Sequence, residues 1–123
     1  QLLQHTFFHL RESGGTKISS AYELCLKQIY ERFRPEDWNI YPFHYSDGDN
    51  WSARDTEFCV TMLRDEILPR VNQFCYGQVK SAHGSGQFKK DLDNALGGEE
   101  QLVTVGVGDR GDIPASIKTF LGK

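Results

Sequence analysis

Several features are scarce in this sequence, and each shortage excludes a class of protein. The chain has only three cysteines, Cys25, Cys59 and Cys75, and no CxxC pair, which argues against a zinc site or a disulfide framework. Basic residues number 14 against 17 acidic ones, so the basic face that nucleic-acid binding requires is not expected. No apolar run approaches the roughly 20 residues of a membrane-spanning helix. We therefore expect neither nucleic acid nor membrane as a partner.

What is present is the composition of a globular protein. The 123 residues are 38% hydrophobic, 25% charged and 12% aromatic, and this length corresponds to about one domain. The three cysteines fit small buried side chains in a reducing compartment. No segment resembles a secretory signal, so we expect a cytoplasmic protein. The chain starts at Gln1 and its only methionine is Met62, which we interpret as a piece of a longer chain.

Apolar residues at helical spacing predict four helices. The first runs from Ile18 to Phe33, with a capping box at Ser20–Glu23 and Pro35 closing it. A second is marked by apolar residues from Cys59 to Leu68 and ends near Pro69. The remaining two are expected at 88–96, stopped by two glycines, and at 113–121, with Asp112 as its N-cap.

Short apolar runs between the helices predict strands at 39–45, 74–79 and 102–107. Residues 6–10 fit either a short strand or a lead-in segment. Pro42 is unusual within a strand, because proline cannot donate a hydrogen bond and favours an edge or a bulge. The alternation of helices and strands predicts an α/β fold, a three-layer sandwich with a mostly parallel sheet.

Ligands in open α/β sheets bind at the carboxyl ends of the strands, which draws attention to two polar loops. Ser46–Asn50 directly follows the strand at 39–45, and Ser13–Thr16 opens the helix that leads into that strand. A carboxylate from one loop and a hydroxyl from the other are hard-oxygen ligands that suit magnesium. The alternative is purely structural, since Asp-Gly is a common turn and Ser or Thr before a helix is a common cap.

Other residues could carry chemistry, with less support. Asp47 and Asp49 together would allow metal-dependent hydrolysis, although loop carboxylates are more often turn formers or metal ligands. His44 and His83 could act in catalysis, but a histidine beside tyrosines in a strand is more often a packing residue. Gly106–Gly111 misses the dinucleotide-binding spacing by one place and is interpreted as a strand-to-helix loop.

The segment Ser13–Thr16, followed by Ser19–Ala21 and by Trp38–Tyr41 running into Ser46–Trp51, resembles the bacterial YeaH/YhbH family of uncharacterised proteins. Its members carry names from stress and sporulation contexts, and the family resembles the von Willebrand factor A (vWA) superfamily. The resemblance is densest from about His5 to Leu68.

The resemblance implies a metal-ion-dependent adhesion site holding Mg²⁺ or Mn²⁺. Thr16 would be its threonine ligand and Asp47 its aspartate, with Ser46 in the flanking position. An acidic side chain of a partner protein would fill the open position on the ion. Asp49, Asn50 and Trp51 could contribute to the partner surface, since an exposed tryptophan can anchor a partner.

One part of the family pattern is missing, because no DxSxS motif occurs in the chain. Residues 1–123 therefore resemble the C-terminal part of a single vWA-like domain whose N-terminal strands are absent. The site is incomplete, and we expect this piece alone to bind no metal. The strand at 39–45 would then be an open edge, covered by a homodimer, a helix or an N-terminal segment.

The sequence thus predicts a non-enzymatic interaction module in a bacterial stress or sporulation-related signalling context. The resemblance also implies a serine protein kinase system as a partner, because genes for such a kinase commonly neighbour those of the family. The alternatives are a metal-dependent hydrolase that uses Asp47 and Asp49, and a structural scaffold without a metal.

Overall fold

The computed structural model describes residues 3–11, 17–79 and 86–108. In these ranges the chain alternates strands with helical segments. In chain order these are β1 (Gln4–Leu10), α1 (Ile18–Arg32), β2 (Trp38–Ser46), α2 (Ala53–Met62), a π-helical turn (Leu63–Ile67), a 3₁₀ turn (Leu68–Arg70), β3 (Phe74–Val79), α3 (Gln87–Leu96) and β4 (Leu102–Val107). The strands form one parallel sheet in the order β1-β2-β3-β4. The predicted α/β class is confirmed.

β2 lies inside the sheet, between two partners. It pairs with β1 from Gln4↔Trp38 to Leu10↔His44 and with β3 from Phe43↔Cys75 onward. The prediction that 39–45 forms an open edge is therefore wrong. Of the covers considered, the N-terminal segment is the one observed, because residues 4–10 form a full strand along β2.

Pro42 is accommodated at a gap in hydrogen bonding on the β3 side. There the β2–β3 register begins only at Phe43. Before it, Ile40 is bonded through both its N–H and its carbonyl to Asn72, in the connection that precedes β3. The donor that proline lacks falls between these two sets of bonds. Pro42 can thus lie in an interior strand, because no β2–β3 hydrogen bond is required from its nitrogen.

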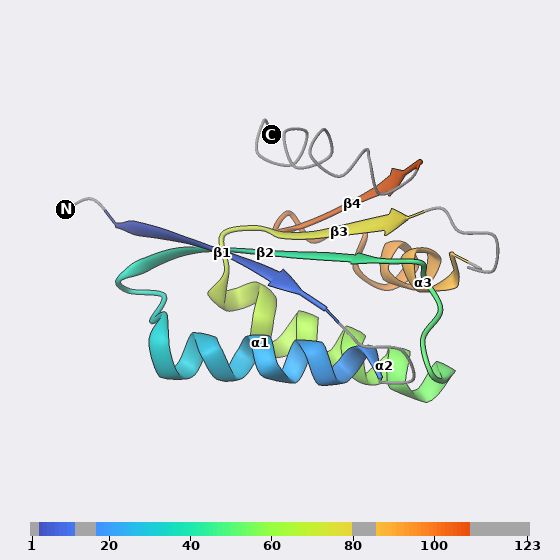
Figure 1. The fold of residues 1–123 in the computed structure, drawn as a ribbon, viewed down its shortest axis with the longest axis horizontal. Helices are drawn as coiled ribbons and strands as arrows, with labels where there is room; N and C mark the ends of the chain where they lie inside the picture. Colours follow the sequence, from blue (N-terminus) through green and yellow to red (C-terminus); the bar gives the residue numbers. More distant parts are fainter. Residues whose placement is uncertain (1–2, 12–16, 80–85, 109–123) are drawn as a thin grey trace.

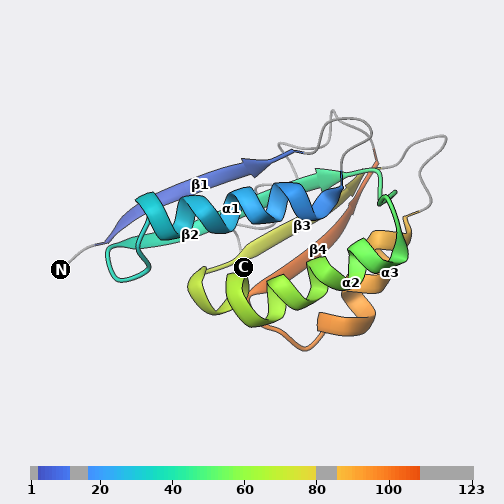
Figure 2. The same cartoon turned by 90° about the horizontal axis from the view of Figure 1, so that it is seen from below.

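The three described helices lie on one face of the sheet (Figures 1 and 2). Residues spaced three or four apart on α1 point into the core, among them Ile18, Tyr22, Cys25 and Ile29. Tyr22 meets Phe74 of β3 edge to face at 5.3 Å between ring centroids. These aromatic contacts tie α1 to the middle of the sheet.

The opposite face of the sheet is also apolar. Phe43 and Cys75 are buried there, with Tyr41, Tyr45, Val103 and Val105 packed against them. Phe7 of β1 stacks on Tyr41 with ring centroids 5.1 Å apart, although half of its surface remains exposed. A sheet that is apolar on both faces is consistent with the predicted three-layer sandwich.

The helix ends differ from the predictions. α1 begins at Ile18 after Lys17, so Ser20 lies inside the first turn and the predicted capping box is wrong. α2 begins at Ala53, six residues before the first apolar marker, because Ser52 caps it by accepting a hydrogen bond from the Asp55 N–H. α3 and the strands at 74–79 and 102–107 match, whereas the helix predicted at 113–121 lies outside the described residues. None of the helices that the structure describes has the length and apolar character to cross a membrane.

Candidate functional site

The candidate site is the β2–α2 loop, residues 47–52, together with Ser46 at the end of β2. The first turn of α1 and the start of α3 lie at the same edge of the sheet, beside the carboxyl ends of β2 and β3 (Figures 1 and 2). This edge is where ligands bind in open α/β folds.

Local hydrogen bonds set the shape of the loop. The Ser46 hydroxyl oxygen accepts the Gly48 N–H at 3.0 Å, and Oδ1 of Asp47 accepts the Asp49 N–H at 3.1 Å. Both are side-chain turns that tighten the backbone just after β2. Ser46 is buried, whereas Asp47 and Asp49 are exposed. The loop therefore presents two carboxylates to solvent from a fixed backbone.

Gly48 lets the loop pack directly against its neighbours. Its φ of +86° is in the region that favours glycine. A Cβ here would come within 2.4 Å of the Gln78 side chain on β3 and 2.7 Å of the Gly86 Cα. The Gly48 carbonyl also accepts the Phe88 N–H at the start of α3. The loop is thus held against the ends of both β3 and α3.

The first turn of α1 is capped by residues far along the chain. Lys17, which precedes the helix, makes no side-chain capping bond. Instead, the Ile18 N–H donates to Oδ1 of Asn50 at 3.1 Å. The Ser19 N–H donates to Oδ2 of Asp55 at 3.1 Å, and the Ser19 hydroxyl donates to the other oxygen of Asp55 at 2.5 Å. Two of the donors left open at a helix start are satisfied in this way.

Asp55 and Asn50 also join α2 to this network. The Asp55 N–H donates to the Ser52 hydroxyl at 3.0 Å, and the Asn50 amide donates to the Thr56 hydroxyl at 3.0 Å. Asp55 and Thr56 are buried. The starts of α1 and α2 therefore share one set of polar contacts with the loop.

Trp51 forms the exposed end of the loop. Its side chain is 65% exposed, and the Lys17 ammonium lies 4.8 Å from the centre of its ring. This cation–π contact is a further link between the start of α1 and the loop. An exposed aromatic ring held in place is a suitable contact for a protein partner.

Five of the six predicted site residues are already close in the sequence and lie at the end of β2 and in the loop that follows it, namely Ser46, Asp47, Asp49, Asn50 and Trp51. Thr16, the sixth, lies outside the described residues, as does His83. Across residues 3–11, 17–79 and 86–108 no group of three His, Cys, Asp or Glu side chains could hold a metal ion. The metal ligands expected at Thr16 and Asp47 therefore remain a prediction.

His44 has the packing role that the sequence favoured. It is fully buried, its Nδ1 lies 2.9 Å from the Tyr22 hydroxyl, and its ring packs against Tyr22, Tyr76 and Phe88. Sequence reasoning missed Ser19 and Asp55. No local signal could have paired them, because they are 36 residues apart.

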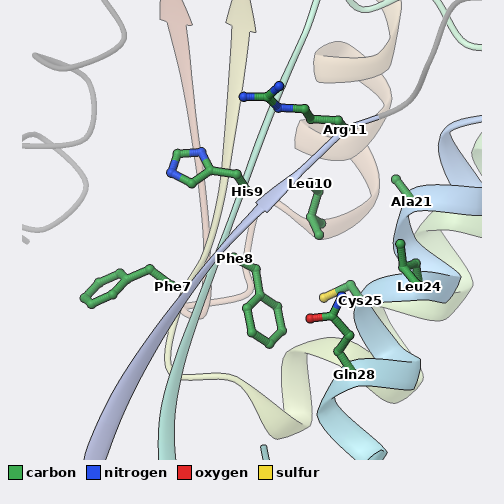
Figure 3. Close-up of a pocket in the computed structure, with 9 residues that line it drawn as sticks. All are labelled: Phe7, Phe8, His9, Leu10, Arg11, Ala21, Leu24, Cys25 and Gln28. Atoms are coloured by element: carbon green, nitrogen blue, oxygen red, sulfur yellow. The ribbon is translucent and has the colours of Figure 1, made fainter. Parts of the chain in front are cut away.

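A hollow of about 250 Å³ lies elsewhere, between β1 and α1 (Figure 3). Phe8 and Leu10 point from β1 toward α1, whereas Phe7 and His9 point to the other face of the sheet. Cys25 lines the hollow, and burial raises the pKa of its thiol to about 12, so this thiol stays protonated at neutral pH and is a poor nucleophile.

Comparison with known proteins assigns the family. A family model described as a protein of unknown function, DUF444, matches residues 1–123. The chain belongs to this family. It is 35% identical over 122 residues to a UPF0229 protein of Ruminiclostridium cellulolyticum, covering 98% of this chain and 30% of the relative. It is 37% identical over 124 residues to the UPF0229 protein CPE1333 of Clostridium perfringens, again covering 98% of this chain and 30% of the relative.

The DUF444 chain also resembles the UPF0229 protein OB2647 of Oceanobacillus iheyensis. That match is 47% identical over 76 residues, which is 62% of this chain and 19% of the relative. The chain thus spans no more than about a third of the length of these relatives. No solved structure matches it. The predicted relation to an uncharacterised bacterial family is confirmed at this level, and the vWA assignment stays a prediction.

Proposed function

We propose that this DUF444 chain is part of a protein-interaction domain that binds its partner through a divalent cation, with Asp47 as a ligand. The supporting observation is the position of Asp47. It is an exposed carboxylate directly after an interior parallel strand, and its loop is shaped by the Ser46 and Gly48 contacts. A rigid carboxylate at this edge is a suitable ligand for a hard cation.

The chemistry of the loop favours Mg²⁺ or Mn²⁺. These ions take oxygen ligands and retain several waters, so a few protein oxygens are enough. Thr16 is the second ligand that the family resemblance implies. The longer protein would supply the others, because the described residues of this chain do not form a complete set.

The partner in this proposal presents an acidic side chain. A cation held by few carboxylates keeps excess positive charge, and a partner carboxylate would complete its coordination. Trp51, fixed beside the loop by Lys17, would supply apolar contact area next to the ion. This pairing of one ionic contact with an aromatic anchor is typical of strong interface positions.

The test is a titration of Mn²⁺ into a full-length protein that contains this chain, with the Mn²⁺ affinity measured by isothermal titration calorimetry. We expect Asp47→Ala to weaken Mn²⁺ binding at least about tenfold, since a direct ligand is lost. Asp37→Ala is the matched control, because Asp37 is also exposed but lies next to the amino end of the same strand. Equal affinities of wild type and Asp47→Ala would contradict the proposal.

A further inference from the structure

We propose that Asp55 and Asn50 are positioning residues for the Asp47 site. They fasten the first turn of α1 to the β2–α2 loop and so fix that loop for ligand binding. This inference rests on the proposed function for its consequence at the metal. Its structural part, the fastening, can be tested without any metal.

The fastening consists of long-range bonds that replace ordinary capping. Asn50 accepts from Ile18, 32 residues away, and Asp55 accepts from Ser19, 36 residues away. A helix start is normally capped by the residue that precedes it, and Lys17 does not do so here. The first turn of α1 therefore depends on these two side chains for its order.

The burial of Asp55 shows that its carboxylate has a specific role. It is only 6% exposed, and a buried carboxylate is costly unless hydrogen bonds compensate it. Both of its oxygens accept from Ser19, and the Cys59 thiol lies 3.9 Å from Oδ2. With its oxygens used in this way, Asp55 acts through the residues it holds.

Asn50 connects the first turn of α1 to the loop that carries Asp47. It is three residues beyond Asp47 in the same loop, and it contacts α1 and α2 at once through Ile18 and Thr56. Magnesium-like ions demand near-ideal octahedral geometry. If the loop shifted relative to α1, the site would bind the cation more weakly even with every ligand present.

The first experiment is Mn²⁺ titration of the full-length Asp55→Asn variant. Asparagine keeps the volume but replaces one acceptor oxygen by a donor, so it cannot accept both Ser19 bonds. We expect an affinity about tenfold weaker than wild type. Leu96→Ala is the control, since it removes buried contacts at the last turn of α3, lowers stability and should leave Mn²⁺ affinity unchanged.

The second experiment is hydrogen exchange in metal-free protein. We expect Asp55→Asn to speed exchange at the amides of Ser19, Gly48 and Asp49 by at least about tenfold relative to Leu96→Ala. Unchanged exchange at Gly48 and Asp49 would overturn the positioning role, whatever the metal does. Faster exchange with unchanged Mn²⁺ affinity would overturn the link to the metal. A wild-type protein without Mn²⁺ binding would overturn only the proposed function, because the exchange result still decides the fastening.

Discussion

Gly48 is the residue on which the shape of the candidate site depends most directly. An L-residue at its φ of +86° costs about 1–2 kcal/mol, and the added Cβ would overlap the Gln78 side chain and the Gly86 backbone. Overpacking of this kind costs about a further 1–3 kcal/mol. We expect Gly48→Ala to lower the free energy of unfolding by about 2–5 kcal/mol, measured by urea denaturation.

Gly86 provides the matched control for that measurement. Its φ is also positive, at +71°, but among the residues that the structure describes a Cβ there would meet only the Gln78 Cδ, at 3.9 Å. Gly86→Ala should therefore show the conformational cost alone, about 1–2 kcal/mol. The difference between the two variants measures the close packing of the loop. Equal losses in the free energy of unfolding would mean that the Gln78 side chain and the Gly86 backbone shift to accommodate the added methyl group without a further energetic cost.

At single residues, sequence reasoning succeeded where the cause is local. The packing role of His44 could be predicted because its neighbours in the strand are aromatic, whereas the ligand role of Asp47 stays a prediction. Asp55 was not found, since an acidic residue in the first turn of a helix is ordinary by sequence. Its role comes from Ser19, which the fold brings to it from 36 residues away.

For the helical elements, the structure makes opposite predictions for two serines. Ser52 caps α2, so Ser52→Ala should lower the free energy of unfolding by about 1 kcal/mol. Ser20 is exposed inside the first turn of α1, and alanine is the better helix former there. Ser20→Ala should change stability by less than about 0.5 kcal/mol, or raise it.

Urea denaturation of both serine variants beside wild type measures these effects. A loss of about 1 kcal/mol in Ser20→Ala would restore the capping box that the sequence predicted at 20–23. A loss below about 0.5 kcal/mol in Ser52→Ala would contradict the cap that Ser52 forms on α2.

The elements themselves could be predicted where one pattern dominates. α3 and β3 have clear periodicity or a continuous apolar run, and their positions matched. α2 was placed too late, because its first turn contains polar residues that serve the site rather than the core, notably Asp55 and Thr56. The prediction that 39–45 forms an open edge failed at β1, because residues 6–10 fitted either a strand or a lead-in segment and a seven-residue strand gives little periodic signal. The pairing of β1 with β2 is a long-range contact that a local sequence pattern does not encode.

At the scale of the whole molecule, two buried thiols make stability depend on pH in the alkaline range. Burial raises the pKa of Cys25 and of Cys75 from 9.0 to about 12. In the unfolded chain these thiols lose their protons above about pH 9, whereas in the folded protein they retain them. The unfolded state then binds fewer protons, so the free energy of unfolding falls as pH rises from about 9 toward 12.

Each thiol should contribute a slope of up to about 1.4 kcal/mol per pH unit in that window, and none well below pH 9. Urea denaturation between pH 7.5 and 10.5, values chosen as about 1.5 units on either side of the unfolded thiol pKa, measures the slope. The doubly substituted Cys25→Ala, Cys75→Ala protein is the comparison, because it keeps every other titratable side chain of the wild type. We expect it to be less stable at neutral pH, since two buried side chains are shortened, and to lose less stability per pH unit. Parallel curves for the two proteins would show that these thiols ionise as readily in the folded protein as in the unfolded chain, and that the sheet and α1 do not exclude water from them.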